Sequence, residues 1–408
     1  MRFCVEGGER MMGWWRSLGQ FGKDIQGWAA EARVLRWLTL LWIGSGWVVV
    51  LSASYASADL TYGDGLYYCK RQLIWIGLGL VLMQGIAVVP LRIWLRGAPW
   101  TMVFALAVLW ALLIPGIGYE VNGAVRWVQV GPVPIQPSEF LKPLLVLHSA
   151  MALGQWDRLR DRQRWFWLGS VAIALIGILL QPNLSTASLC GISLWLVSLA
   201  AGLPLTYLWG TALGGGLLAV ISISLRSYQQ RRIIAFLNPW ADPQGSGYQL
   251  VQSLLAIGSG SFWGTGFGLS KQKLANLPIQ YTDFIFSVYA EEFGLVGSLL
   301  LLGLIGVYGG VGLWVAVKTQ SATVRLVATG SVVFLVGQSL LNIGVATGGL
   351  PTTGLPLPFF SYGGSSMLAS CILAGLLTRA ARESSAPVAT LPQRNGSSKK
   401  SRQPTQVT

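Results

Sequence analysis

Residues 277–316 read LPIQYTDFIFSVYAEEFGLVGSLLLLGLIGVYGGVGLWVA, and this stretch decides the fold class. A polar, proline-containing loop ends at Asp283, and an apolar run follows over 284–316. About 20 apolar residues cross the hydrocarbon core of a bilayer, so this run is long enough to span a membrane as a tilted or broken helix. Asp283, Glu291 and Glu292 need an explanation, because a charge in lipid costs several kcal/mol.

Similar apolar runs recur along the chain. Hydrophobic residues make up 53% of the 408 residues and charged residues only 11%, a composition typical of a polytopic membrane protein. Backbone polar groups in lipid must be satisfied within each segment, so the runs are predicted to be helices and the fold all-α. We expect about ten transmembrane helices, at roughly 34–53, 72–90, 99–118, 138–153, 165–181, 185–201, 205–225, 284–316, 322–345 and 365–381.

The chain divides into three parts by composition. Residues 1–33 form a charged N-terminal segment that lacks the compact apolar core of a signal peptide. Residues 34–382 form the transmembrane domain, with a large outer loop at about 226–282, and the polar tail 383–408 is expected to be disordered. The four cysteines are scattered without metal-ligand spacing, and no disulfide is needed.

Positive charge is distributed unevenly between the predicted loops. With the N-terminus inside, 20 of the 29 Lys and Arg residues fall on the inner side and eight on the outer side. Cytoplasmic loops carry the excess of Lys and Arg, so both termini are predicted to be cytoplasmic. The net charge of +14 reflects this topology and an attraction to anionic lipid, and we expect no nucleic-acid partner.

The three most elaborate loops, at 118–138, 226–282 and 346–365, all fall on the predicted outer side. Loops of this kind at one membrane face usually carry function, so the protein is expected to work at the outer surface. The glycine-rich stretch GSGSFWGTGFG at 258–268 does not follow a strand of a βαβ unit, which excludes a nucleotide-binding loop. We expect a flexible loop beside a membrane-embedded substrate there.

The fourth apolar run contains three ionisable residues. Glu139 and Lys142 are three positions apart on one helix and can pair. The pair is either a structural lock, or Lys142 faces an outward cavity and meets an anionic group. His148 is expected to be a core histidine, because no second ligand or carboxylate lies at helical spacing from it.

Asp283 has two interpretations. It is the N-cap of the helix that begins at Phe284, or a general base whose pKa is raised by partial desolvation at the membrane surface. Glu291 lies about 12 Å further along a straight helix, whereas paired glycosidase carboxylates are roughly 5 to 9.5 Å apart. A single base, with Glu291 and Glu292 structural or paired with Lys142, therefore fits the spacing better.

Basic residues of the large outer loop also allow two interpretations. They bind phosphate at the outer leaflet, or they form a solvated basic surface. The residues are Arg231, Arg232, Lys271 and Lys273.

Four stretches carry a resemblance to a known family. They are NGAVRWVQVGPVPIQPSEFLKP (122–143), QPNLSTASL (181–189), the segment 236–297 that contains YTDF, and TGGLPTTGLPLPFFSYGGSSM (347–367). In this order they resemble the SEDS proteins (shape, elongation, division and sporulation), the group of FtsW and RodA, over residues 34–382. The long basic ends favour a division-type member.

The resemblance implies a peptidoglycan glycosyltransferase that polymerises lipid II on the outer face of the cytoplasmic (inner) membrane. Its expected partners are a class B penicillin-binding protein and other divisome or elongasome membrane proteins. Asp283 matches the Asp that the family requires for activity, and Glu139 and Lys142 match the family's polar residues in the fourth helix. The sequence departs from the family pattern in two places, where Asn183 replaces an acid and Tyr281 replaces a histidine.

The mechanism implied for such an enzyme uses Asp283 to accept the proton of an acceptor sugar hydroxyl. The leaving lipid pyrophosphate then needs a cation, supplied by the protein or by a divalent metal such as Mg²⁺ or Mn²⁺. No nucleotide cofactor is needed, and Ser361 and Tyr362 are expected to be structural or to line the cavity. Candidate substrate-binding residues are Lys142, Glu139, Arg126, Arg231, Arg232, Lys271 and Lys273.

Two other functions remain open from the sequence. A transporter that flips lipid II across the membrane would also need intramembrane charges and a cavity. The outer loops are concentrated on one face, which argues against it. A non-catalytic scaffold for cell-division proteins is the third interpretation.

Overall fold

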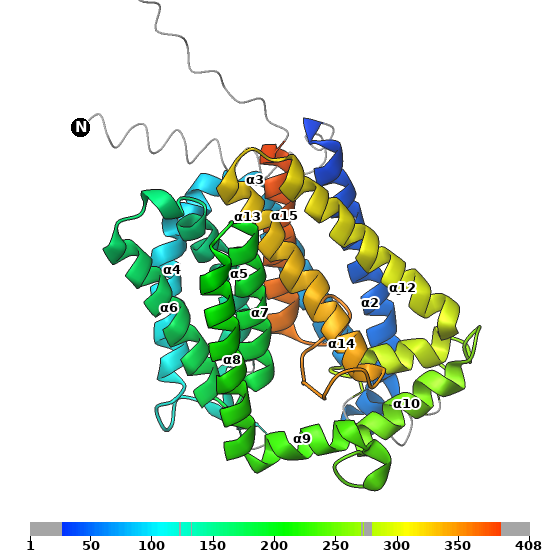
Figure 1. Ribbon diagram of the computed structural model, residues 1–408. Coiled ribbons are helices and arrows are strands. Elements are labelled where there is room, and N and C mark those ends of the chain that lie inside the picture. Colours follow the sequence, from blue (N-terminus) through cyan, green and yellow to red (C-terminus); the bar gives the residue numbers. More distant parts are fainter. Residues whose placement is uncertain (1–26, 122–123, 132, 271, 273–279, 385–408) are drawn as a thin grey trace, which may run out of the picture.

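The computed structural model describes residues 27–121, 124–131, 133–270, 272 and 280–384, which form a bundle of long helices (Figure 1). Within these residues every predicted apolar run contains a helix. The helices are α2 (Ala30–Tyr62), α3 (Tyr67–Val88), α4 (Leu91–Ala111), α5 (Pro137–Leu153), α6 (Asp161–Leu180), α7 (Leu184–Ala200), α8 (Leu205–Leu225), α12 (Ile285–Lys318), α13 (Ala322–Val332) continued by α14 (Gln338–Ala346), and α15 (Gly364–Ser384).

Eight helical segments of the described chain are long and apolar enough to cross a membrane, counting α13 to α14 as one. The other two, α5 and α7, have 17 residues each. The predicted bounds of the third span were wrong, because α4 begins at Leu91, directly after Pro90, and ends at Ala111. Proline at a helix start is favoured by its fixed φ. The charged first turns of α4 concealed this start from a search for apolar residues.

The core of the bundle is built around α15. This helix is rich in small residues, and it is buried along nearly its whole length. A Cβ on Gly375 would lie 2.8 Å from the carbonyl oxygen of Met83, and one on Gly79 would lie 2.7 Å from Cys371 Sγ. Small residues let helix backbones approach closely in membranes, where the hydrophobic effect does not drive helices together. Glycine at these two positions therefore allows α3 and α15 to pack.

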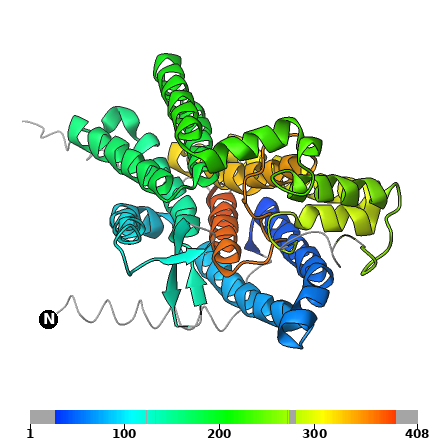
Figure 2. The ribbon, with the colours of Figure 1, turned by 90° about the horizontal axis from the view of Figure 1, so that it is seen from below.

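Helix α8, in contrast to the buried α15, is almost wholly exposed. It stands at the edge of the bundle when the molecule is seen from below (Figure 2). Leu208 is its one buried residue. A helix with so little protein contact presents its apolar side chains to lipid.

The long helix α12 is broken at Gly294, which is one of the two alternatives, tilted or broken, that its length predicted. Gly294 has φ +65° and ψ −162°, a conformation that only glycine adopts without strain. The break frees backbone groups, and the glycine-rich stretch binds them. Thr265 and Gly266 donate N–H groups to the carbonyls of Glu291 and Glu292 at 2.9 and 3.0 Å.

The same stretch also accepts hydrogen bonds from the other side of the break. The N–H groups of Leu295 and Val296 donate to the carbonyls of Ser261 and Phe262 at 3.0 and 3.2 Å. We call residues 261–266 the strap. The expectation of a flexible loop at 258–268 was wrong, because its backbone replaces the helical hydrogen bonds that the break removes, as lipid requires.

The elaborate loops gather at one end of the bundle, as their alternation with the helices predicted. They include β1 (Tyr119–Val121), β2 (Ala124–Val130) and β3 (Val133–Ile135), which form an antiparallel sheet in the order β1-β2-β3. The outer loop 226–282 contains α9 (Ser227–Leu237) and α10 (Tyr248–Gly260). The first turn of α2 and the last turn of α15 lie at the other end (Figure 1).

Candidate active site

Asp283 lies in the turn before α12, at the end of the bundle that holds the loops. The helix begins at Ile285, and the N-cap position is occupied by Phe284 without a side-chain cap. The interpretation of Asp283 as the N-cap was therefore wrong. Its backbone carbonyl accepts a hydrogen bond from Asn342 Nδ2 at 2.7 Å, and the same amide donates to the carbonyl of Leu355 at 2.8 Å. The half-buried side chain of Asp283 therefore does not cap α12 and is available for another role.

The carboxylate of Asp283 and the guanidinium of Arg232 converge on Gly354. A Cβ on Gly354 would lie 3.4 Å from Asp283 Oδ2 and 3.9 Å from Arg232 Nη2. Gly354 has φ +74°, which favours glycine, so no side chain fills the space between the two charges. Burial raises the pKa of Asp283 above its ordinary value, and the positive charge of Arg232 partly opposes that shift.

Arg232 is held in place from two sides. Its Nη1 donates to the carbonyl of Thr352 at 3.0 Å. Its Nη2 donates to the hydroxyl of Tyr228, and its guanidinium carbon lies 4.6 Å from the centre of that ring. Arg232 therefore links α9 to the loop 347–363, which carries Gly354. The neighbouring Arg231 is exposed to solvent.

The ion pair predicted between Glu139 and Lys142 is present on α5, and Gln338 connects it to the loop 347–363. Lys142 Nζ lies 2.6 Å from Glu139 Oε1 and 2.8 Å from Gln338 Oε1, with all three residues buried. Gln338 Nε2 in turn donates to the carbonyl of Pro356 at 2.7 Å. A π-helical turn, η4 (Val333–Gly337), directly precedes Gln338, and such turns often mark functional positions.

Glu291 and Glu292 do not lie in the pair with Lys142. Glu291 Oε2 accepts a hydrogen bond from Ser270, and Glu292 Oε1 accepts one from Ser52 at 2.6 Å. Both side chains are buried. Of the two interpretations, structural or paired with Lys142, the contacts with Ser270 and Ser52 favour the structural one.

Three tyrosines, whose contact was not predicted from the sequence, form a group beside Asp283. Tyr281 donates its hydroxyl to that of Tyr68 at 2.9 Å, and the ring centres are 4.5 Å apart. Tyr362 packs edge-on against both rings. Burial raises the pKa of Tyr281, so its phenol stays neutral at pH 7 and cannot replace an imidazole base. The sequence signal available for this group was the pair of adjacent tyrosines Tyr67 and Tyr68, which comes shortly before the predicted span 72–90.

Ser361 forms hydrogen bonds that hold two loops together. Its hydroxyl donates to the carbonyl of Thr282 at 2.7 Å and accepts from the N–H of Leu357 at 2.7 Å. These bonds fix the loop 347–363 against the residue before Asp283.

Arg126 and Asn183 order the neighbouring loops. Arg126 donates to the carbonyls of Gln181 at 2.9 Å and Pro182 at 2.5 Å, which joins β2 to the turn between α6 and α7. Asn183 caps α7 by accepting from the N–H of Thr186 at 3.2 Å. An amide caps a helix as well as an acid does, so this departure from the family pattern is structurally neutral.

Two of the predicted basic residues, Lys271 and Lys273, lie outside the described residues, as does Cys4. The cysteines that the structure describes, Cys69, Cys190 and Cys371, are buried and free. His148 is a core histidine whose Nε2 lies 2.8 Å from Ser170 Oγ. Within the described residues no group of three His, Cys, Asp or Glu side chains could hold a metal ion.

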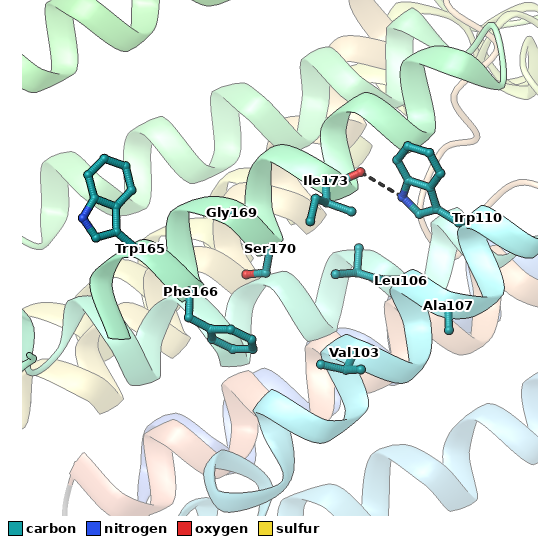
Figure 3. A pocket seen from close by; sticks show the side chains of 9 residues that line it. All are labelled: Val103, Leu106, Ala107, Trp110, Trp165, Phe166, Gly169, Ser170 and Ile173. Atoms are coloured by element: carbon teal, nitrogen blue, oxygen red, sulfur yellow. Dashed lines mark hydrogen bonds between the residues drawn. The ribbon is translucent and has the colours of Figure 1, made fainter. Parts of the chain in front are cut away.

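A groove of about 400 Å³ lies between α4 and α6 (Figure 3), and Asp283 is not among its lining residues. Trp110 closes one part of it by donating from Nε1 to the carbonyl of Ile173 at 3.2 Å. The lining is almost wholly apolar, which suits a lipid chain rather than acid–base chemistry. The lining residues are Val103, Leu106, Ala107, Trp110, Trp165, Phe166, Gly169, Ser170 and Ile173.

Comparisons with known proteins agree with the resemblance. A family model described as a cell cycle protein of the FtsW/RodA/SpoVE type matches residues 32–386. A probable peptidoglycan glycosyltransferase FtsW of Synechocystis sp. is 54% identical over 364 residues, which cover 89% of this chain and 92% of that protein.

Two solved structures are similar in fold as well. One is a chain from a peptidoglycan synthase complex, described as coordinating polymerization and crosslinking, with a TM-score of 0.71, 29% identity, and coverage of 88% of this chain and 99% of that chain. The other is the rod shape determining protein RodA of Thermus thermophilus, with a TM-score of 0.64, 29% identity and the same coverage of 88% and 99%.

Proposed function

The chain belongs to the FtsW/RodA/SpoVE family, and from that premise we propose that it is a peptidoglycan glycosyltransferase in which Asp283 is the general base. Its substrate is lipid II, which it polymerises into glycan strands. It is a multi-pass membrane protein of the cytoplasmic membrane, with the end that carries Asp283 on the outer side. Its similarity to FtsW proteins and its basic ends favour a division role.

One observation carries this assignment. The Asp283 carboxylate and the Arg232 guanidinium flank a position that Gly354 leaves open, at the end of the bundle where three outer loops meet. A base benefits from a raised pKa and from access to its proton donor, and the raised pKa and half-buried side chain of Asp283 support this assignment. Single-base chemistry also agrees with the contacts of Glu291 and Glu292, which lie within the bundle.

The reaction consistent with these positions is a direct displacement. The acceptor sugar's 4-hydroxyl gives its proton to Asp283, and its oxygen forms a bond to the anomeric carbon of the lipid-linked donor. The bond from that carbon to the pyrophosphate oxygen breaks, and the electron pair leaves with the polyprenyl pyrophosphate. Asp283 holds the released proton until water removes it.

The leaving pyrophosphate requires positive charge at the moment of bond breaking. Arg232 is the cation assigned to this role, because it lies beside Asp283 and is already oriented by Thr352 and Tyr228. Arg126, on the neighbouring sheet, adds to the positive field of the same face. Lys142 has a positioning role, since it holds the loop 347–363 through Gln338.

A divalent cation fits this site only if the protein and the substrate pyrophosphate both coordinate it. Mg²⁺ is commonly bound by one or two carboxylates together with substrate phosphates. Asp283 is the residue that would hold it with the pyrophosphate, where the ion would add charge to that supplied by Arg232. The acid–base and positioning steps above rest on the protein's own residues.

The tyrosines Tyr68, Tyr281 and Tyr362 are suited to hold the sugars. Aromatic rings offer apolar faces to sugar rings, and their hydroxyls offer hydrogen bonds. A class B penicillin-binding protein is the proposed partner, supplying crosslinking to the glycan strands. The similar peptidoglycan synthase complex, which combines polymerization and crosslinking, supports that proposal.

Sealed vesicles containing fluorescent lipid II separate this function from a transporter. The enzyme makes glycan chains from lipid II on the accessible side and leaves lipid in the other leaflet unchanged. Movement of lipid II between leaflets without chain formation would instead support the flippase interpretation. Normal cell division with a variant that binds its partner but lacks Asp283 would support the scaffold.

A further inference from the structure

A second cavity, of about 380 Å³, lies at the end of the bundle opposite Asp283. It is formed where α4 begins, α5 ends, α13 begins and α15 ends. The distribution of Lys and Arg predicts that this end faces the cytoplasm. The cavity therefore lies at the level of the inner-leaflet headgroups, between helices from distant parts of the chain.

Two arginines, Arg92 and Arg96, line the cavity one turn apart on α4. Both are exposed, and within the described residues neither forms an ion pair. Like charges at this spacing on a helix destabilise it unless an anion lies between them. An anion between the two guanidinium groups would relieve that repulsion, and no carboxylate of the described residues pairs with either arginine.

The carboxylate in the cavity, Glu383, is already satisfied. Its Oε1 accepts from the N–H of Leu91 at 2.8 Å and from Arg379 Nε at 2.8 Å, and Arg379 Nη2 lies 2.7 Å away. Since Arg379 neutralises Glu383, the charges of Arg92 and Arg96 remain in excess. The cavity is consequently basic despite the acid in its wall.

The remaining walls suit both parts of a phospholipid. Ser321 and Thr323 stand at the start of α13, where the Ser321 hydroxyl caps the N–H of Val324 and the positive end of the helix dipole attracts anions. Leu95 and Met151 add apolar surface. A cavity that is basic at one part and apolar at another, next to lipid-facing residues of α4, fits a headgroup joined to acyl chains.

We propose that this cavity binds the phosphate headgroup of an anionic phospholipid of the inner leaflet, held by Arg92 and Arg96. Basic pockets between transmembrane helices on the cytoplasmic side are typical of such lipid sites. The chain's own tail is a poor occupant, because residues 385–408 contain Lys and Arg but no Asp or Glu. The lipid would join α4 to α13 and α15. This proposal is independent of the chemistry at Asp283.

The test measures lipid bound to the full-length protein in detergent. Phosphatidylglycerol, phosphatidylcholine and inorganic phosphate are titrated separately, and bound lipid is counted by native mass spectrometry. The variant is Arg92→Gln with Arg96→Gln. The matched control is Arg158→Gln with Arg162→Gln, two exposed arginines of which the first lies in the connection between α5 and α6 and the second in the first turn of α6.

We expect phosphatidylglycerol to bind the wild type and the control equally. The Arg92→Gln, Arg96→Gln variant should bind it roughly 10- to 30-fold more weakly, since each basic residue near an anionic headgroup contributes about 1 kcal/mol. Phosphatidylcholine, with no net charge, should show no difference between variants.

Three results would overturn the proposal. Equal phosphatidylglycerol binding by both arginine variants would remove the site from this cavity. Equal binding of phosphatidylcholine would exclude recognition of charge. Inorganic phosphate bound as tightly as phosphatidylglycerol, with the same dependence on Arg92 and Arg96, would show a free-anion site instead of a lipid site. A circular dichroism spectrum like that of the wild type checks that each variant is folded.

Discussion

Replacing Gly294 with alanine tests whether the break in α12 and the strap form one unit. The residue has φ +65° and ψ −162°, a backbone conformation essentially restricted to glycine, and holding a residue with a Cβ there costs about 1–3 kcal/mol. The new Cβ would lie 2.4 Å from the backbone nitrogen of Gly264 and 2.7 Å from the carbonyl oxygen of Phe262. Backbone atoms cannot be displaced cheaply, so the strap must move.

Movement of the strap weakens its hydrogen bonds to α12. The new methyl group would press on the Phe262 carbonyl, which accepts from the N–H of Val296, and the adjacent Ser261 carbonyl accepts from the N–H of Leu295. Each such bond contributes about 1 kcal/mol, so the total loss of unfolding free energy for Gly294→Ala is about 3–5 kcal/mol.

The loss is measured by unfolding the purified protein in mixed detergent micelles with increasing SDS, followed by tryptophan fluorescence. Gly303→Ala is the matched control, because it lies in the same helix and a Cβ there meets nothing within 4 Å. The control should unfold like the wild type or slightly later, since alanine favours helix over glycine. If Gly294→Ala unfolded together with Gly303→Ala, the role assigned to the strap would be refuted.

Two further predictions concern the charges of the site. Arg232→Gln removes the charge that lowers the pKa of Asp283, so the acidic limb of the polymerisation pH profile should move to higher pH. The control Arg231→Gln, at an exposed arginine, should leave the limb in place. An unmoved limb in Arg232→Gln would contradict the electrostatic link between Arg232 and Asp283. Lys142→Met should lower the free energy of unfolding by about 3–5 kcal/mol, because it leaves Glu139 buried without a cation. Adding Glu139→Gln should restore most of that loss. Additive losses in the same SDS titration would show that the two residues are not coupled.

The helices and the end of the bundle that carries the loops were predictable because both depend on local composition. Each apolar run could be recognised by its length, and alternation of the runs placed the loops together. The pairing of Glu139 with Lys142 was also predictable, since positions three apart meet on a helix. Even the break in α12 could be anticipated from excess length.

Contacts between distant segments could not be predicted in this way. The strap pairs residues 261–266 with residues about thirty positions later, through backbone groups that carry no sequence signal. Its glycines suggested flexibility, whereas the close approach of Gly264 to α12 requires them for packing. Composition alone does not distinguish these two uses of glycine.

Contacts between distant segments at the candidate active site were equally unpredictable from the sequence. Asp283 and Arg232 could be named as candidates, but their meeting over Gly354 depends on a third segment of the chain. Gln338 and Asn342, which fix that segment, are uncharged residues inside an apolar run and gave no signal. The tyrosine group likewise joins α3 to two loops that are distant in sequence.

The central claim is tested most directly by polymerisation of lipid II by Asp283→Asn in proteoliposomes. The substitution keeps the size of the side chain and the backbone contact with Asn342, so the protein should remain folded and bind lipid II. Loss of a general base should slow chain formation about 10²- to 10⁴-fold, while Asp64→Asn, at an exposed acid of the turn between α2 and α3, should polymerise like the wild type. Polymerisation by Asp283→Asn at the wild-type rate would contradict the assignment of Asp283 as the base.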